Sequence, residues 1–222
     1  MSTPSTRALI LGFALFSYIC VPSTNAQDGE DSPVVFLEVS CMKSLNDDYR
    51  DVETEIWQPM HQAMVDAGQK MGWAFYWVMY GDRSMCDHYT VNLYRGADQL
   101  DANVNYRDVF ESVHPDKNVD EAMARTSASR EMVRSELWRM VDGKLPTDFT
   151  YAHVARLNVT DGREYTKMEN EIFTPLRNAR VDEGLHQGWA RYRLVSPTGD
   201  AVPYNTGSVI FTNESLIQWG QG

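Results

Sequence analysis

Two glutamates occupy the same place in a motif that occurs twice in this chain. The motif ETEIWQP begins at Glu53 and returns as ENEIFTP, which begins at Glu169. On a helical wheel Glu53 falls about 40° from Tyr49, inside the apolar stripe that also carries Ile56 and Met60. A carboxylate on an apolar face must be paired, hydrogen-bonded or given a raised pKa. Glu53 is therefore a candidate general acid or base.

A structural role is the competing interpretation of the same glutamates. Each could accept a hydrogen bond from the indole of Trp73 or Trp189, or from backbone groups freed by the proline that follows. The duplication favours this interpretation, because an active site is seldom needed twice whereas a packing solution is. The sequence leaves both roles open.

His61 is the second candidate for a catalytic role, because it shares a helix flank with Trp57, and its counterpart in the second copy is Arg177. Aromatic side chains recur in the strand that follows, and arginines replace two of them in the second copy. These aromatic and basic positions could hold an apolar ligand with a polar or acidic end. The expected ligand-binding residues are Trp57, Phe75, Trp77, Arg191 and Arg193.

Motifs for metals, cofactors and common hydrolases are missing from the sequence. The five histidines show no H-x-x-x-H or H-E-x-x-H spacing, so we expect no metal site. No G-x-G-x-x-G, P-loop or G-x-S-x-G motif occurs. We expect no cofactor, with a haem held by a single histidine as a less favoured alternative.

The motif belongs to a longer duplication that organises the whole chain. Residues 49–76 align without a gap with residues 165–192, and 13 of the 28 positions are identical. The first copy predicts a strand at 34–41, a helix at about 46–70 that Pro59 bends, and strands at 73–80 and 88–94. The second copy predicts a strand at 151–159, a helix at 163–186, and strands at 189–195 and 207–212. Between the copies we expect helices only, at 97–113 and at 119–141.

The first residues and the charge indicate where the protein works. Residues 1–26 have the pattern of a signal peptide, and residues 27–33 read as a flexible leader, so we expect a periplasmic or secreted protein without a membrane span after cleavage. The formal net charge is −11. Such a surface repels phosphate backbones and anionic membranes, which argues against a nucleic-acid partner.

A β-α-β-β unit of this kind resembles the ferredoxin-like plait, and two fused units resemble the dimeric α/β-barrel superfamily. The motif ETEIWQP, followed by Gly72-Trp73-Ala74, also resembles the sequences of a group of secreted bacterial proteins without an assigned activity. The resemblance implies an α+β fold with two tandem ferredoxin-like units that form a pseudo-dimeric barrel. The expected boundaries are 34–96 for the first unit, 97–149 for a helical connector and 150–222 for the second unit.

The plait also implies a disulfide bond. Its first and third strands are antiparallel neighbours, which would place Cys41 and Cys86 at the same end of the sheet and within bonding range. An oxidising compartment favours such a pair.

Two functions fit these observations. The first is a secreted barrel that binds a small apolar or aromatic molecule, and that could be a cofactor-independent enzyme. The second is a non-catalytic binding or assembly module whose barrel is fully packed. A cavity with a buried carboxylate would favour the first, and a core filled by Trp and Tyr would favour the second. The sequence does not indicate an oligomeric state.

Overall fold

A single seven-stranded antiparallel sheet forms the centre of the molecule. The computed structural model describes residues 34–215 and residue 218, so the expected signal peptide and leader lie outside the described residues. The strands follow the order β2-β3-β1-β4-β6-β7-β5. Their bounds are β1 Val35–Ser44, β2 Gly72–Trp77, β3 His88–Arg95, β4 Arg130–Lys144, β5 Tyr151–Leu157, β6 Gly188–Ser196 and β7 Thr206–Thr212.

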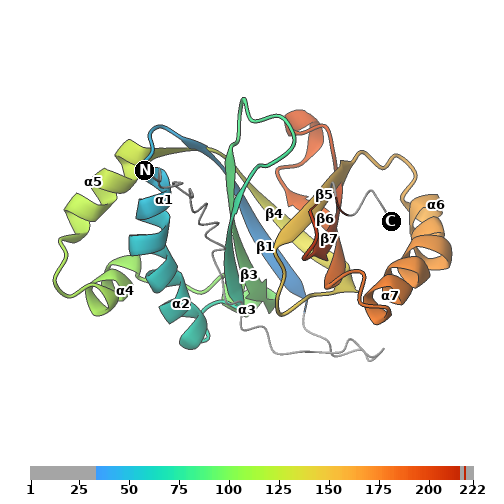
Figure 1. Ribbon diagram of the computed structural model, residues 1–222, viewed down its shortest axis with the longest axis horizontal. Coiled ribbons are helices and arrows are strands. Elements are labelled where there is room, and N and C mark those ends of the chain that lie inside the picture. The colour runs from blue at the N-terminus through green and yellow to red at the C-terminus, as the bar shows by residue number, and fades with distance from the viewer. Residues whose placement is uncertain (1–33, 216–217, 219–222) are drawn as a thin grey trace, which may run out of the picture.

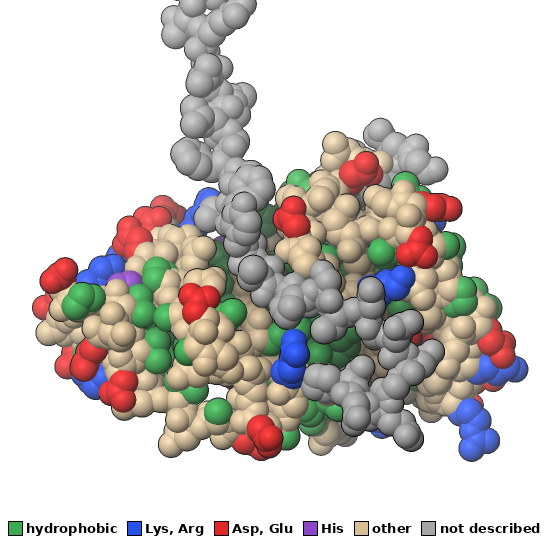
Figure 2. All heavy atoms as spheres, turned by 90° about the horizontal axis from the view of Figure 1, so that it is seen from below, with side chains coloured by type: hydrophobic (Ala, Val, Ile, Leu, Met, Phe, Trp, Pro, Cys, Tyr) green, Lys and Arg blue, Asp and Glu red, His purple; other side chains and the backbone are tan. Residues whose placement is uncertain are grey.

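Helices flank the sheet on both sides (Figure 1). The first group, α1, α2, α4 and α5, lies beyond β1 and β3, and the second group, α6 and α7, lies at the opposite end of the molecule. The bounds are α1 Tyr49–Val52, α2 Gln58–Asp66, α3 Gly96–Leu100, α4 Tyr106–Val113, α5 Val119–Ser129, α6 Gly162–Met168 and α7 Thr174–Asp182. A short 3₁₀ helix, Gly199–Ala201, precedes β7. Figure 2 shows acidic side chains scattered over one face with basic ones between them.

The two predicted β-α-β-β units are confirmed, with strand boundaries within a few residues of those expected. The prediction of a continuous helix at 119–141 is wrong. The segment is helical only to Ser129 and continues as the 15-residue strand β4. With α5 and β4, the first unit is a complete β-α-β-β-α-β plait. The second unit contributes three strands to the described sheet.

Strand β4 joins the two units, because it pairs with β1 on one side and with β6 on the other. Gly143 allows the close approach to β6. Its φ is +142°, and a Cβ there would lie 2.4 Å from the Trp189 carbonyl oxygen. An L-residue with a side chain could not adopt this geometry without strain.

Each predicted long helix is interrupted by a five-residue π-helical turn at the repeated motif. The turns are Glu53–Trp57 between α1 and α2, and Glu169–Phe173 between α6 and α7. Each π-helical turn immediately precedes the helix that contains Pro59 or Pro175. A proline within a continuous helix removes one backbone hydrogen bond, which agrees with the irregular turn beside it. π-helical turns of this kind occur frequently at functional sites.

Two apolar clusters stabilise the fold. The first lies on the inner face of the sheet and joins both units, with Leu37, Leu93, Trp138, Ala190, Tyr192 and Phe211 at its centre. The second joins the helices of the first unit, with Val52, Ile56, Met60, Phe110 and Ala122. Aromatic side chains therefore fill the centre of the curled sheet.

The predicted disulfide bond is present. Cys41 and Cys86 are bonded, and their Cα atoms are 5.4 Å apart. Strands β1 and β3 are antiparallel neighbours, as the plait requires, and Cys86 lies just before β3. Both cysteines are buried.

Candidate functional site

The helix layer of the first unit meets the sheet through polar side chains. Glu53, in the π-helical turn, is completely buried and forms an ion pair with Arg130, the first residue of β4. The Arg130 guanidinium also lies over the rings of Tyr49 and Trp57, at 5.6 and 5.1 Å from their centroids. The partner of Glu53 is therefore a guanidinium, and not the indole considered from the sequence.

Burial dominates the electrostatics of Glu53. It raises the pKa of the Glu53 carboxyl to about 7, and the charge of Arg130 works against the rise. The neighbouring Tyr49 hydroxyl also has a raised pKa, because of burial first and the Glu53 charge second. Glu53 can therefore change protonation near neutral pH.

His61 lies in α2, eight residues after Glu53, and its ring is placed between two indole rings. Its imidazole stacks on Trp57 and Trp73, with centroid distances of 5.9 and 4.8 Å. Its Nδ1 is 2.9 Å from the Nζ of Lys70. Burial, with the charge of Lys70 second, lowers the pKa of His61 to about 2, so the imidazole is neutral and accepts the hydrogen bond from Lys70.

Lys70 is the buried cation of this interface, and a polar chain leads from it across the sheet. Its Nζ donates to the Oδ1 of Asn92 at 2.8 Å, and Asn92 Nδ2 donates to the Oε2 of Glu38 at 3.2 Å. Burial lowers the pKa of Lys70 to about 8, and the charge of Glu38 limits the fall. His61, Lys70, Asn92 and Glu38 therefore form one connected network.

The second unit repeats the glutamate but changes its partner. Glu169 is buried and is paired with Arg177, whose guanidinium lies over Phe173 and Trp189 at 5.4 and 5.2 Å. Burial pushes the pKa of Glu169 upward, but the hydrogen bonds from Arg177 and Tyr165 outweigh it, so the pKa is lowered.

The exchange of His61 for Arg177 has a structural reason. Both side chains lie between the same pair of aromatic positions. In the first unit Arg130, from β4, supplies the positive charge beside Glu53. The described second unit has no strand equivalent to β4, and Arg177 supplies that charge from the helix instead. The difference between the copies at this position therefore preserves the ion pair.

The other expected ligand-binding residues do not meet in one cavity. Phe75 contacts the rings of Tyr49 and His88, whereas Trp77 is 58% exposed, with the Arg50 guanidinium 5.6 Å from its ring. In the second unit Arg191 is buried and lies 3.7 Å from Asp142, and Arg193 is exposed. Of the seven predicted catalytic and ligand-binding residues, Glu53, Trp57 and His61 are brought together. Their roles remain predictions.

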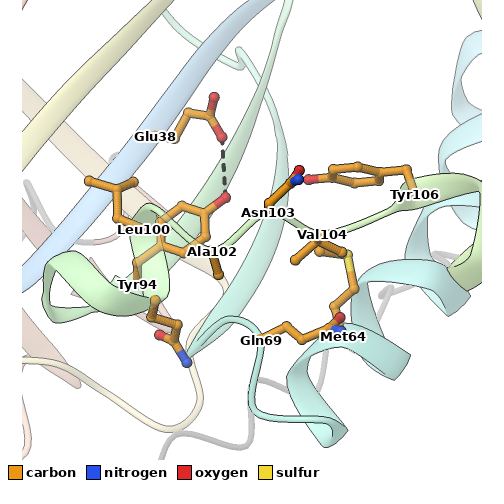
Figure 3. Close-up of a pocket in the computed structure, with 10 residues that line it drawn as sticks. Glu38, Met64, Gln69, Tyr94, Leu100, Ala102, Asn103, Val104 and Tyr106 are labelled. Carbon is orange, nitrogen blue, oxygen red and sulfur yellow. Dashed lines mark hydrogen bonds between the residues drawn. The ribbon is translucent and has the colours of Figure 1, made fainter.

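A pocket of about 300 Å³ opens beside this network, on the helix-bearing face of the first unit (Figure 3). Glu38 of β1 and Tyr94 of β3 form its polar wall, and the Tyr94 hydroxyl donates to Glu38 Oε2 at 3.3 Å. Tyr106, at the start of α4, lies across from them. The remaining wall combines apolar and amide side chains: Met64, Leu100, Ala102, Val104, Gln69, Gln99 and Asn103.

The pocket raises the pKa values of its two tyrosine hydroxyls. Burial, with the Glu38 charge second, raises the pKa of both Tyr94 and Tyr106. Both therefore keep their protons at neutral pH and can donate hydrogen bonds. Within the described residues the buried Oε1 of Gln69 has no hydrogen-bond partner. The pocket therefore presents acceptors and phenolic donors beside an apolar wall.

Glu38, Tyr94 and Tyr106 were missed from the sequence. They come from two strands and a helix start that are distant in the chain, and no fixed spacing connects them. Glu38 gave the one usable signal, as the only charged residue in the otherwise apolar or small run 34–41.

Membrane-spanning helices and metal-binding groups are both absent from the described residues. Among residues 34–215 and 218, no helix is long and apolar enough to cross a membrane. The same part of the chain holds no group of three or more His, Cys, Asp or Glu side chains placed to hold a metal ion.

Comparisons with known proteins identify the fold. No protein-family model matches the chain, and no curated protein matches it in sequence. A crystal structure provisionally named a monooxygenase, from Fusobacterium nucleatum subsp. nucleatum, is similar over 85% of this chain and 79% of its own, with a TM-score of 0.50 and 13% identity. Another, provisionally named a chlorite dismutase, covers 85% of this chain and 83% of its own, with a TM-score of 0.47 and 12% identity. The chain has the ferredoxin-like fold of the dimeric α/β barrels, with both units in one polypeptide.

Proposed function

We propose that the protein binds a small molecule in the pocket beside Glu38. The observation that carries this proposal is the convergence of one carboxylate and two phenols on a cavity of about 300 Å³ with an apolar wall. Small-molecule sites typically combine an apolar lining with a few polar groups that fix orientation. The volume is at the lower end of the usual range, which suits a ligand of one ring or a short chain.

The polar wall determines the chemistry of the ligand. The oxygens of Glu38 and Gln69 are acceptors, so the ligand should present a hydroxyl or amine to them. Met64, Leu100 and Val104 should contact its apolar part. We therefore propose an aromatic or aliphatic amine or alcohol as the ligand class. A negative protein surface favours the approach of an amine over that of an anion.

Glu38 is also the group that would act if the bound molecule reacts. Its link through Asn92 to the buried cation Lys70 resembles the support that a general base needs. In this proposal Glu53 and His61 position the helix that forms one side of the pocket, and do not touch the ligand. A cofactor-independent proton transfer is the reaction that this arrangement could support.

The disulfide bond supports a protein that works in an oxidising compartment, and we propose secretion or a periplasmic location on that basis. The filled barrel centre bears on the second candidate function. Trp138, Tyr192 and Phe211 fill the apolar part of the space between the units, so no apolar ligand is proposed there.

Native mass spectrometry of the protein purified from its host tests the binding proposal, and an absorbance spectrum tests for haem. We expect the native protein to show added mass that corresponds to a small amine or alcohol, and we expect its absorbance spectrum to lack the bands of haem. Benzylamine and benzyl alcohol, titrated into the purified protein by calorimetry, serve as probes. Glu38→Gln should weaken benzylamine binding at least about 10-fold, because a hydrogen bond to a charged group contributes about 1.5–3 kcal/mol.

Glu131→Gln is the matched control, because Glu131 is an exposed glutamate on β4, away from the pocket wall. This variant should bind as the unmodified protein does. The proposal is wrong if Glu38→Gln and Glu131→Gln bind the probes equally well, or if neither probe and no co-purified molecule binds.

A further inference from the structure

A second polar cluster lies on the inner face of the sheet, opposite to the Glu38 pocket. Where Leu37 of β1 pairs with Trp138 of β4, this face is apolar. It becomes charged toward the C-terminal end of β1, where Glu136 lies opposite Val39 and Arg134 lies opposite Cys41. Glu136 is 2% exposed. A buried charge on an inner face requires specific partners.

Glu136 has neutral donors as well as cations around it. The Trp138 indole donates to its Oε2 at 3.0 Å, and the Tyr204 hydroxyl donates to its Oε1. The Nε of Arg134 lies 2.6 Å from Oε1, and a terminal nitrogen of Arg156 lies 4.0 Å from Oε2. Two guanidinium groups therefore face one carboxylate.

Arg156 connects the two units across the inside of the sheet. It comes from β5, at one edge of the sheet, and donates to the hydroxyl of Tyr89 in β3 at 3.3 Å. Its guanidinium lies over the rings of Tyr89 and Tyr204, at 5.2 and 5.1 Å. This stacking fixes the plane of the guanidinium and leaves its edge for hydrogen bonding.

The terminal nitrogens of Arg134 are its available donors. Within the described part of the chain neither of them donates a hydrogen bond, whereas the buried Nε forms the ion pair with Glu136 without a well-aligned hydrogen bond. The side chains of Arg134 and Arg156 remain 23% and 25% exposed. Most of each side chain is therefore enclosed, and a part of each remains in contact with solvent.

The charge balance of the cluster points to a singly charged anion. Two arginines and Glu136 give a local surplus of one positive charge, in a protein whose formal net charge is −11. We propose that the cluster of Arg134, Arg156, Tyr89 and Tyr204 binds a small organic carboxylate, whose oxygens accept hydrogen bonds from the two guanidinium edges. A carboxylate matches the planar fork of arginine and cancels the surplus charge. Phosphate has similar oxygen geometry but carries more charge than the cluster can balance.

This site is independent of the Glu38 pocket, since Glu38 lies on the other face of β1. The Glu38 pocket presents acceptors and suits an amine or alcohol, whereas the Arg134 cluster presents donors and suits an acid. Failure of one proposal therefore leaves the other unchanged.

Benzoate is the probe for the test, with benzyl alcohol as the uncharged analogue and inorganic phosphate as the alternative oxyanion. We expect calorimetry to detect benzoate binding. Benzyl alcohol, for which the Glu38 pocket is the expected site, should bind Arg134→Gln and the unmodified protein equally. Phosphate should bind at least about 10-fold more weakly than benzoate. The affinity for benzoate should fall as sodium chloride is raised, because partly exposed charges are screened.

Arg134→Gln should weaken benzoate binding at least about 10-fold, since charge-assisted bonds contribute about 1.5–3 kcal/mol. The variant loses one ion-pair partner of the buried Glu136, so its folding is checked by circular dichroism, while Arg156, Trp138 and Tyr204 still contact that carboxylate. Glu136→Gln should have the opposite effect and tighten benzoate binding, because it removes the internal competitor for the guanidinium groups. An effect of opposite sign would not follow from a loss of structure. Arg139→Gln, on the same strand but exposed, is the matched control and should bind as the unmodified protein does.

Three results would overturn the proposal. The first is a lack of benzoate binding by the unmodified protein at roughly 10 mM, ten times a dissociation constant of about 1 mM. The second is equal benzoate binding by Arg134→Gln and Arg139→Gln, and the third is tighter binding of phosphate than of benzoate. If Arg134→Gln fails to fold, the salt dependence and the Glu136→Gln variant still decide the question.

Discussion

The duplicated glutamates should respond to pH in opposite directions. Burial raises the pKa of Glu53 to about 7 from an ordinary value of 4.5, whereas the pKa of Glu169 is lowered because Arg177 and Tyr165 outweigh burial. Because folded Glu53 holds its proton more tightly than the unfolded chain does, its contribution to stability is fully present below pH 4.5 and is lost as the pH rises through 7. The contribution of Glu169 has the reverse sign, and is lost as the pH falls through its lowered pKa.

The magnitude follows from the shift. A difference of 2.5 pKa units corresponds to about 3 kcal/mol at 1.36 kcal/mol per unit. We therefore expect Glu53→Gln to remove about 3 kcal/mol of pH dependence from the free energy of unfolding between pH 4.5 and 8. Glu169→Gln should change the pH dependence in the opposite sense and only below about pH 4.5, because the folded pKa of Glu169 lies below its ordinary value of 4.5.

Urea unfolding, followed by tryptophan fluorescence at four or five pH values, measures these free energies. The comparison uses slopes against pH, so it does not depend on the stability of either variant at one pH. The reasoning is refuted if Glu53→Gln keeps the slope of the unmodified protein, or if both variants change the slope in the same direction.

Three further predictions use other parts of the fold. Replacing Cys41 and Cys86 by alanine should lower the free energy of unfolding by about 4 kcal/mol, which is the loop-entropy value for a separation of 45 residues. The midpoint of urea unfolding under non-reducing conditions measures this loss, and an unchanged midpoint would contradict a stabilising role of the disulfide. The unfolding free energy should rise between pH 8 and 10, because the pKa of Lys70 is lowered to about 8 while the unfolded lysine keeps its proton, and Lys70→Met should flatten that rise. Ile56→Ala should destabilise the protein by about 2–5 kcal/mol, whereas Ile172→Ala, at the equivalent but 56% exposed position, should cost less than about 1 kcal/mol; equal losses of stability would contradict the reasoning from burial.

The sequence predicted the duplicated units well, because they depend on local patterns. The disulfide followed from the resemblance to the plait, whose first and third strands are neighbours. It failed at β4 because of what the inner face contains. Met132, Val133, Leu137, Trp138 and Val141 are compatible with helical spacing. The alternation of a strand is present in the same residues, but Arg134 and Glu136 occupy inner positions where an apolar side chain is expected. Buried charges therefore concealed the strand.

The candidate sites were predictable only in part. The position of Glu53 on an apolar helix face followed from spacing, but its partner Arg130 did not, because that residue was assigned to a helix. Glu38 and Tyr106 are brought together by the crossing of a strand and a distant helix start, for which one sequence contains no signal. The difference between His61 and Arg177, which the sequence marked as a candidate for function, is explained by the ion pair of each unit.

The position of β4 between the two units has a consequence for the order of folding. By Lys144 the chain has produced every element of the first plait, so that plait can form while the remaining residues are still being synthesised. Its outer edge is then the template on which β6 pairs, and β7 and β5 follow outward from it. The register of the second unit is therefore set by its pairing with β4, a strand that belongs to the first unit. Errors in the first unit should consequently be transmitted to the second, whereas damage confined to β5 should leave the first unit intact.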